Sequence, residues 1–570
     1  MVEMLSKKDK QYYLNRLGAL DLERSSFVSH WKELSENIEP RSGNFFVQDR
    51  NSGTKRHGKI INSRGTQAHR NAISGMFAGT VSPTKRWFKL ETLNQKLMGS
   101  TAVKQYLYDV ENLLYSIFLD SNFYSAAPIT LGEAILFGTG AMVQLDDFNS
   151  VTTFKPHAVG SYYISTNSKN EVDTFVEKRD WTVKQMVDEF GIENVSPTVK
   201  NAYELNQYDT WYQVCQFIDP NPDFNPSKTD ESKYMKYRSA WFELGGMSAN
   251  VGRSTQSNSV FTDEKFLRKS GFQEFPVHVF RWSVTGSDIY GTNCPGMVAL
   301  GDVKMLQIQE KRKAQAIDKM VNPPLKGPPT LIDVPISSLP GGVTIYDQDT
   351  NKEGLSPLYL VDPKVRDLAE DILKTERRIN EAFFVDLFLA ISNMEGIQPK
   401  NQLELSKRNA ERLLMLGPPL ERLQQEFLNN IVERTFQQAL RAGILPEPPE
   451  ELSGAALNIN FVSALAQAQR ANDVGSIERI AGFVQMLSQF KPTILDKYDA
   501  DDALEKYSQF VGGVPSNIVS QDEAEAVRTQ RAEQQQKMMQ AQAGEMQTKS
   551  AGHMAGAVKD MADAEHAGEE

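Results

Sequence analysis

The chain has 570 residues, of which 40% are hydrophobic and 24% charged, and its formal net charge is −11. This length exceeds what one hydrophobic core supports, so we expect three or more domains of ordinary soluble composition. The first residues lack the apolar segment of a signal peptide, and no apolar run approaches the ~20 residues that a membrane span needs. The two cysteines, Cys215 and Cys294, form no disulfide framework and favour a reducing cytoplasm.

The N-terminal part of the chain is predicted to be helical as far as residue 137. Residues 6–39 indicate one amphipathic helix, which Pro40 ends, and its apolar face carries Phe27, Trp31, Leu34 and Ile38. A basic loop follows over 41–62. Further helices are predicted at 64–79, 101–119 and 122–137.

Between residues 141 and 282 the hydrophobic pattern changes to the alternation that is typical of strands. A short helix at 183–190 interrupts the strands, because Thr182 and Gln185 form a capping box and Gly191 favours a helix end. Residues 246–260 form a polar loop. We expect an α+β block with mostly antiparallel strands at 141–146, 151–155, 161–166, 172–178, 210–218, 234–244 and 275–282.

Two long helices, separated by a proline-rich excursion, follow this block. The first covers 297–322, and the second begins near Asp362-Pro363 and continues to about residue 388. The excursion, 323–362, is predicted to contain short β-pieces at 330–332 and 343–346. Both helices are too polar to bury a wide stripe within one monomer. They favour packing beside copies of themselves, and the alternative is a solvated helical hairpin.

The remaining chain is predicted to be mostly helical. Residues 389–402 are irregular, helices follow at 403–415 and 420–442, and a run of prolines from Pro446 marks a boundary. A small helical domain is expected over 455–511. Ser520 and Glu523 then form a capping box that opens a tail rich in Ala, Gln, Met and Glu.

Two motifs resemble catalytic signatures, but one lacks a required residue and the other lies in the wrong structural context. Gly53-x4-Gly58-Lys59 approaches a phosphate-binding loop, but Ile60 stands where Ser or Thr would hold magnesium. Glu231-x-Lys233 imitates a nuclease site but belongs to a loop rather than a buried strand. The seven histidines are scattered, and neither cysteine has a CxxC partner. We therefore expect no enzyme activity, no cofactor and no metal site.

A basic stretch is the clearest charged feature. Residues 41–96 hold 11 Lys and Arg against 2 Asp and Glu, and the candidate basic surface comprises Lys55, Arg56, Lys59 and Arg64. These cations would contact phosphates or an acidic partner protein, or form a solvated surface that balances an acidic neighbouring subunit. Trp87 and Phe88 are expected to fill a core or a subunit contact rather than stack on bases.

Taken in order, these stretches resemble the head-to-tail connector (portal) proteins of short-tailed bacteriophages. The resemblance covers about residues 10–525. It rests on Trp31 to Pro40-Arg41, Ser82-Pro83 to Leu90, Ser121 to Tyr124, Phe137 to Gly140, Thr182 to Gly191, Pro276 to Trp282, Tyr290-Gly291, Asn322-Pro323-Pro324 and Glu421 to Pro446.

The resemblance implies an α+β, portal-like fold. Its parts would be a wing (1–296), a two-helix stem (297–322 and 363–388), a small β-containing clip (323–362), a tunnel-loop region (389–402), connecting helices (403–445), a helical crown (446–515) and a C-terminal helical barrel or flexible tail (516–570). The clip would dock partners through Pro328, Pro329, Pro340, Gly341 and Gly342. The candidates for the channel constriction are Ser392, Asn393, Met394, Glu395 and Lys400.

The resemblance further implies a ring of twelve subunits at one capsid vertex of the virion, made in the host cytoplasm, through which double-stranded DNA is packaged and ejected. The implied partners are the terminase large subunit, the tail adaptor, the major capsid and scaffolding proteins, internal core or ejection proteins and the DNA, with no membrane. We predict that stem ion pairs, within the hairpin or across subunits, join Lys304, Lys311, Arg312 and Lys313 to Glu370 and Asp371. The alternatives are another virion structural or scaffolding protein and a DNA-packaging enzyme subunit.

Overall fold

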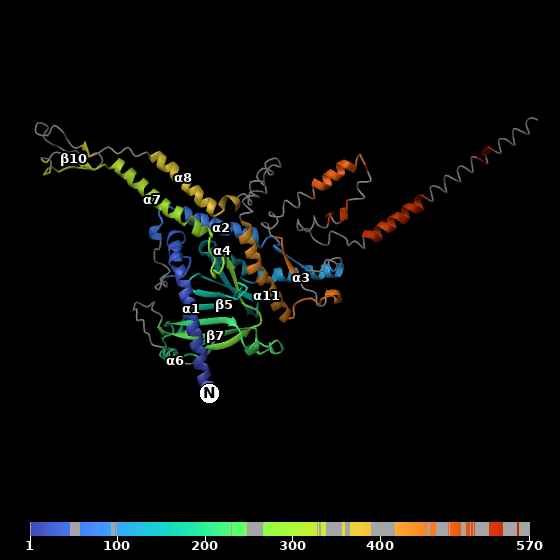
Figure 1. Cartoon of the computed structure of the whole chain (residues 1–570), viewed down its shortest axis with the longest axis horizontal. Coiled ribbons are helices and arrows are strands. Elements are labelled where there is room, and N and C mark those ends of the chain that lie inside the picture. Colours follow the sequence, from blue (N-terminus) through green and yellow to red (C-terminus); the bar gives the residue numbers. More distant parts are fainter. Residues whose placement is uncertain are drawn as a thin grey trace, which may run out of the picture. The chain divides into compact units, whose positions relative to one another are not determined.

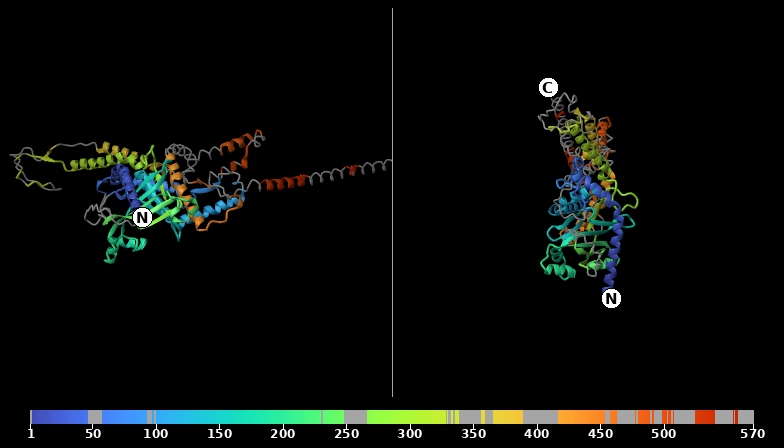
Figure 2. Two further views of the ribbon diagram at one scale, coloured as in Figure 1. Left: turned by 60° about the horizontal axis from the view of Figure 1, so that its bottom comes forward. Right: turned by 90° about the vertical axis from the view of Figure 1, so that its left-hand side faces the viewer.

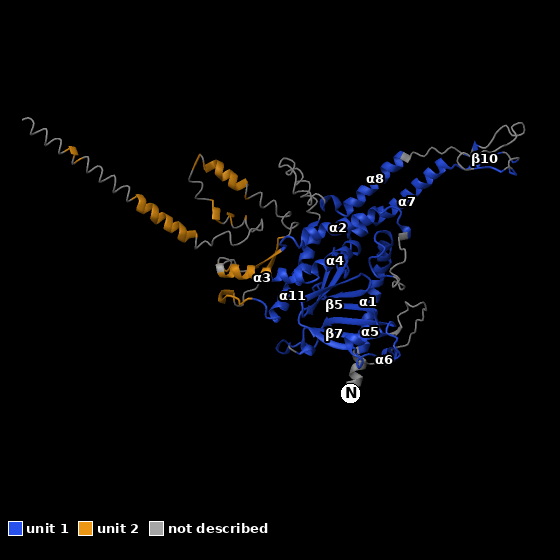
Figure 3. Cartoon of the chain, turned by 180° about the vertical axis from the view of Figure 1, so that it is seen from behind, with its two compact units in different colours: residues 1–87, 113–445, 463–469 blue, residues 88–112, 446–462, 470–570 orange. Residues whose placement is uncertain are grey.

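The fold is described from a computed structural model of the chain (Figure 1). It describes residues 2–45, 57–92, 97, 100–229, 231–247, 266–327, 329, 332–333, 335–337, 356–358, 365–388, 416–452 and 457–462, and short stretches between 477 and 557. The chain divides into two compact units (Figure 3). Unit 1 comprises 1–87, 113–445 and 463–469, and unit 2 comprises 88–112, 446–462 and 470–570.

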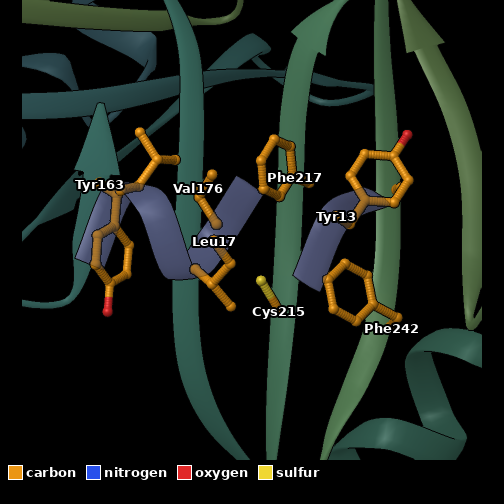
Figure 4. Close-up of a cluster of buried hydrophobic side chains, with 9 residues drawn as sticks. Tyr13, Leu17, Tyr163, Val176, Cys215, Phe217 and Phe242 are labelled. Carbon is orange, nitrogen blue, oxygen red and sulfur yellow. The ribbon is translucent and has the colours of Figure 1, made fainter. Parts of the chain in front are cut away.

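Five antiparallel strands form the larger sheet of unit 1, in the order β4-β5-β6-β7-β8. They are β4 (Tyr162–Thr166), β5 (Val172–Thr182), β6 (Trp211–Pro220), β7 (Tyr237–Met247) and β8 (Arg268–Phe272). The N-terminal helix α1 (Val2–Asn37) covers one face of this sheet, where Tyr13 and Leu17 pack against Phe217 and Phe242 (Figure 4). The alternation of β6 decides which residues meet α1, because Cys215 and Phe217 point to the same face.

The opposite face of the same sheet packs against two short helices, α5 (Val183–Phe190) and α6 (Pro197–Glu204). The predicted capping box of α5 is confirmed, since the Thr182 hydroxyl accepts a hydrogen bond from the Gln185 N–H and the Gln185 side chain accepts one from the Thr182 N–H. Val214 of β6 and Met186 of α5 belong to this second core. Helices on both faces make the sheet a buried middle layer.

A three-stranded antiparallel sheet, in the order β3-β2-β9, forms the other half of the body. It comprises β2 (Thr139–Asp147), β3 (Val151–His157) and β9 (Val277–Arg281), and it packs against α4 (Phe123–Phe137), which in turn contacts α2 (Arg64–Thr80). Gly138 turns the chain from α4 into β2 with a φ of 87°. A Cβ on Gly138 would lie 2.3 Å from the Gly291 carbonyl oxygen, so the turn requires glycine.

Two long helices lie side by side and antiparallel, namely α7 (Pro295–Val321) and α8 (Val365–Ala382) (Figures 1 and 2). At the far end of α7, β10 (Leu325–Lys326) pairs with β11 (Ser356–Pro357). A helical stretch that begins at residue 416 continues through a π-helical turn (Leu423–Leu428) into α11 (Asn429–Arg441). Single 3-10 turns occur at His57–Lys59, Pro226–Lys228, Ser232–Tyr234 and Glu450–Leu452.

Unit 2 contains a two-stranded antiparallel sheet of β1 (Phe88–Thr92) and β12 (Leu457–Phe461). The helix α3 (Thr101–Asp120) begins in this unit, and the division falls within it. The Glu111 side chain accepts a hydrogen bond from the backbone N–H of Leu90 at 2.7 Å, which fixes β1 on α3. Further helical stretches of this unit lie at 479–488 and 524–539.

Most predicted elements are confirmed with boundaries shifted by a few residues, and the mixed helix-and-sheet class is confirmed. Three predictions are wrong. The second long helix does not run unbroken to residue 388, because Phe384 has a φ of 54° and separates α8 from a helical turn at 385–388. The domain predicted as helical over 455–511 contains β12, and Ile332 lies in a turn rather than a strand. The sequence pattern also missed β8 and α6.

Several predicted features lie outside the described residues. They are the predicted loop 246–260 beyond its first two residues, which belong to β7, the start of the second long helix at Asp362-Pro363, the helix at 403–415, the β-piece at 343–346 and the capping box of Ser520 and Glu523. Among the described helices, none is both long and apolar enough to cross a membrane.

Candidate assembly site

The helix α7 is buried at its start and exposed along the rest of its length. Ala299, Val303 and Leu306 are fully buried, whereas beyond Gln307 each residue of the helix is exposed or half-buried. Six large apolar side chains of the helix are exposed, namely Val298, Met305, Ile308, Ile317, Met320 and Val321. A helix that presents this much apolar surface while contacting mainly α8 indicates a protein–protein contact.

Gln307 anchors α7 to the body. Its side-chain oxygen accepts hydrogen bonds from the backbone N–H groups of Ile61 at 2.6 Å and Asn62 at 2.8 Å, and its amide nitrogen donates to the Asn62 carbonyl at 3.0 Å. The Gln307 residue is only 7% exposed, so these three bonds form with little competition from water. Sequence reasoning missed this role, although the i, i+3, i+4 spacing of Val303, Leu306 and Gln307 places the glutamine on the buried face.

The same loop ties both long helices together. The Asn62 side-chain nitrogen donates to Glu310 of α7 and to Glu376 of α8, each at 3.1 Å. Beside it, Gly65 at the start of α2 faces Val303, and a Cβ on the glycine would lie 3.1 Å from a Val303 methyl group. The loop before α2 therefore positions the base of the hairpin that α7 and α8 form.

Polar contacts join the two helices along their length. The Arg378 guanidinium contacts the Asp302 carboxylate at 3.1 Å, and the Gln309 side chain donates to Asp371 at 2.5 Å. All four residues are at least partly exposed, so each contact contributes only about 0–1 kcal/mol. Their spacing sets the antiparallel register of α7 against α8.

The predicted stem charge pairs do not form within one chain, among the residues that the structure describes. Lys304 contacts Glu33 of α1, Lys313 contacts Glu310 at 3.5 Å, and Glu370 contacts Arg366 at 3.8 Å. Lys311 and Arg312 are exposed. The pairing of these cations with Glu370 and Asp371 therefore stays a prediction for contacts between copies of the chain.

The end of the second helix is locked into the body through α2. Phe383 and Leu387 are fully buried, and the Phe388 ring lies against Gly75, where a Cβ would come within 2.3 Å of the ring. The break at Phe384 turns these side chains inward. The chain therefore leaves the hairpin at a fixed point before residue 389.

Helix α11 is held on the three-stranded sheet by buried polar groups. The Arg281 guanidinium, of which only 2% is exposed, makes a two-pronged contact with Glu426 at 2.8 and 3.1 Å. The Gln144 side chain donates to the Thr435 hydroxyl at 2.9 Å and to Gln438 at 2.7 Å. Glu426 lies in the π-helical turn, a geometry that often marks functional positions.

The other predicted site residues lie apart from this hairpin base or outside the described residues. Lys59 contacts Glu36 at 2.5 Å, and Arg64 begins α2. Pro329 is described and exposed. The remaining predicted residues fall outside the described part of the chain, namely Lys55, Arg56, Pro328, Pro340, Gly341, Gly342, Ser392, Asn393, Met394, Glu395 and Lys400. Trp87 and Phe88 are buried, which confirms their predicted core role.

Buried histidines in the body do not gather into a metal site. Burial lowers the pKa of His69, of His157 and of His278 below the usual range, so each is neutral at pH 7. His157 and His278 lie on the outer strands of the three-stranded sheet, whereas His69 lies in α2. The described residues contain no cluster of three His, Cys, Asp or Glu side chains that could hold a metal ion.

An α+β body that carries a long polar helical hairpin fits one class of virion component. The family model described as "Bacteriophage head to tail connecting protein" matches residues 10–519, so the chain belongs to that family. It is 41% identical over 532 residues to the portal protein of Salmonella phage epsilon15, with 93% of each chain covered. It is 40% identical over 539 residues to a probable portal protein of Bordetella phage BPP-1, with 94% of each covered.

Proposed function

We propose that this chain is the portal protein of a short-tailed bacteriophage, the head–tail connector through which double-stranded DNA enters and leaves the capsid. The observation that carries this proposal is the similarity to two portal proteins along nearly the full length of each chain. Chains that align end to end at this identity share a fold, and the connector role follows from the family.

The exposed hairpin supports assembly into a ring. Along α7, Lys311 and Arg312 are exposed, and along α8 the exposed groups include Glu370 and Asp371. The basic groups on α7 of one copy beside these acidic groups on α8 of the next would make a head-to-tail contact that repeats around a closed ring. Individual exposed pairs are weak, but each would recur at every subunit boundary. We propose twelve subunits, with α7 and α8 as the stem.

The net charge of −11 supports a conduit rather than a DNA-binding protein. Phosphate contacts by Lys and Arg are strong and depend on salt, so a ring that gripped DNA would slow its passage. We propose that the clip, residues 323–362, docks the terminase during packaging and the tail adaptor afterwards. Capsid, scaffolding and internal ejection proteins are the other partners, and the mature location is the capsid vertex.

The test is the mass and shape of the purified full-length protein. Light scattering should give a mass near twelve times 64.0 kDa, and negative-stain images should show rings with a central hole. A chain that stays monomeric, both alone and when it is produced with its capsid and scaffolding proteins, would overturn the proposal.

The stem contact has its own test. Lys311→Glu should raise the protein concentration needed for ring formation, because it places an acidic group beside the acidic face of the next α8. The defect should shrink at high salt, which screens the repulsion. Lys311→Arg, which keeps the positive charge at the same position, serves as the control. Ring formation by Lys311→Glu that equals wild type at both low and high salt would contradict this contact.

A further inference from the structure

A single phenylalanine stands fully exposed at the tip of the hairpin between β2 and β3. Phe148 has a relative exposure of 108%, the highest among the large hydrophobic residues that are described. Phenylalanine is seldom left in this state, because its whole ring is in contact with water. Exposed aromatic side chains of this kind act as anchors when they enter a pocket on a partner.

The turn that carries Phe148 is tightly organised. The Asp147 carboxylate accepts hydrogen bonds from the backbone N–H of Asn149 at 3.3 Å, and from the N–H and hydroxyl of Ser150 at 2.9 and 2.8 Å. Val151, which closes the turn, has a φ of 65°, a conformation that a β-branched residue rarely adopts. These contacts order the backbone of the turn that presents Phe148, so little backbone entropy would be lost when the ring binds.

A shallow cavity of about 350 Å³ lies where α1 meets the start of α7. Apolar groups from Phe27, Met297 and Val298 line it together with the polar side chains of His30, Thr292 and Asn293. Val298 is 62% exposed, so the apolar side of the cavity is open to solvent. The site therefore offers an apolar floor with hydrogen-bond donors at its edge.

The phenylalanine and the cavity lie at opposite ends of one strand. The cavity adjoins the start of β2, where the Gly291 N–H, next to Thr292, donates to the Thr139 hydroxyl at 2.8 Å. The hairpin tip follows the other end of β2 at Asp147. A strand of nine residues spans about 27 Å at ~3.4 Å per residue. Phe148 therefore cannot reach the cavity of its own chain.

We propose that Phe148 inserts into the cavity between α1 and α7 of a second copy of this chain. An anchor and a receptor on opposite ends of one subunit make a heterologous contact, which closes into a ring when the rotation permits. The groups beside the two sites are complementary. Asp146 and Asp147 each use one carboxylate oxygen within the chain, and the second oxygen of each would accept hydrogen bonds from His30 and Asn293 at the cavity edge. The inference rests on the proposed ring and names a contact within it, separate from the stem.

The first experiment measures assembly by light scattering over a dilution series. Phe148→Ser should raise the midpoint concentration for ring formation by at least about 10-fold, since truncation of an aromatic anchor has effects of that size. Leu205→Ser is the matched control, because Leu205 is also strongly exposed, at 69%, and lies at the end of α6. This control should assemble as the wild type does.

The second experiment traps the contact covalently. In the double variant Phe148→Cys/Met297→Cys, mild oxidation should link neighbouring copies, and denaturing gels should show a ladder of multimers that neither single variant gives. The native Cys215 and Cys294 are buried and should not contribute. Wild-type rings combined with no ladder and with unimpaired assembly of Phe148→Ser would overturn this inference and leave the proposed function intact. Absence of rings from the wild type, both alone and when it is produced with its capsid and scaffolding proteins, would refute both.

Discussion

Removal of the Gln307 side-chain hydrogen bonds should lower the free energy needed to open the base of the hairpin, and the number of bonds lost sets the expected size of the effect. Gln307→Met keeps the approximate volume and deletes all three hydrogen bonds, which leaves the N–H groups of Ile61 and Asn62 without their acceptor. At about 1 kcal/mol for each net bond, with a larger cost for a donor left unpaired, the local loss is about 2–4 kcal/mol. A loss of 2 kcal/mol corresponds to about a 30-fold change in an equilibrium.

Amide hydrogen exchange measures this loss at the site itself. The N–H groups of Ile61 and Asn62 should exchange about 30-fold faster or more in Gln307→Met, while amides in β6 should keep their protection. Gln315→Ala is the control on the exposed part of the same helix and should change stability by less than about 0.5 kcal/mol. Unchanged exchange at both amides in Gln307→Met would refute the view that this side chain anchors the hairpin.

Three further predictions concern the body. Gly75→Ala should lower the melting temperature, because its Cβ would lie 2.3 Å from the Phe388 ring and overpacking of this kind costs about 1–3 kcal/mol; an unchanged melting curve would contradict that packing. Burial raises the pKa of Glu133 from 4.5 to about 7, so the folded state holds this proton more tightly than the unfolded state does. The contribution of the protonated Glu133 to the free energy of unfolding should therefore be complete below pH 4.5 and fall by about 3 kcal/mol as pH rises through 7. Denaturant unfolding at several pH values should show this trend, and Glu133→Gln should abolish it. Glu426→Ala should lower the free energy of unfolding by about 3 kcal/mol, because it leaves the buried charge of Arg281 without its carboxylate partner. If Arg281→Met lowers it by the same amount, loss of packing rather than an unpaired charge would be the cause.

The sequence was sufficient wherever the structure follows from neighbouring residues. The limits of α2 and α7 were predicted within a few residues because glycine, proline and helix-forming residues act locally. The capping box at Thr182 was predicted for the same reason. The left-handed backbone conformation of Phe384, which ends α8, was missed, since no local signal distinguishes this phenylalanine from its neighbours.

Elements stabilised by distant partners could not be predicted in this way. The Leu457–Phe461 strand alternates apolar and polar residues, but only its pairing with β1 decides that it is a strand. β8 has a polar, glycine-containing sequence and forms at the edge of a sheet through β7. Gln307 lies in a polar run and acquires its role from backbone groups about 245 positions earlier in the chain. The site was therefore predicted as a polar hairpin, without the contact that positions it.

The pairing of β1 with β12 has a consequence for the order of folding during synthesis. The Asn460 side chain donates to Glu91 at 2.9 Å across 369 positions of chain. A ribosome that adds about 5–20 residues per second needs roughly 20–75 s to synthesise that interval. The partner of β1 is therefore absent while most of unit 1 is already available to fold. We therefore expect the strand edge of β1 that pairs with β12 to lack its partner during this time. A chain truncated before residue 457 would leave this edge open and prone to aggregate.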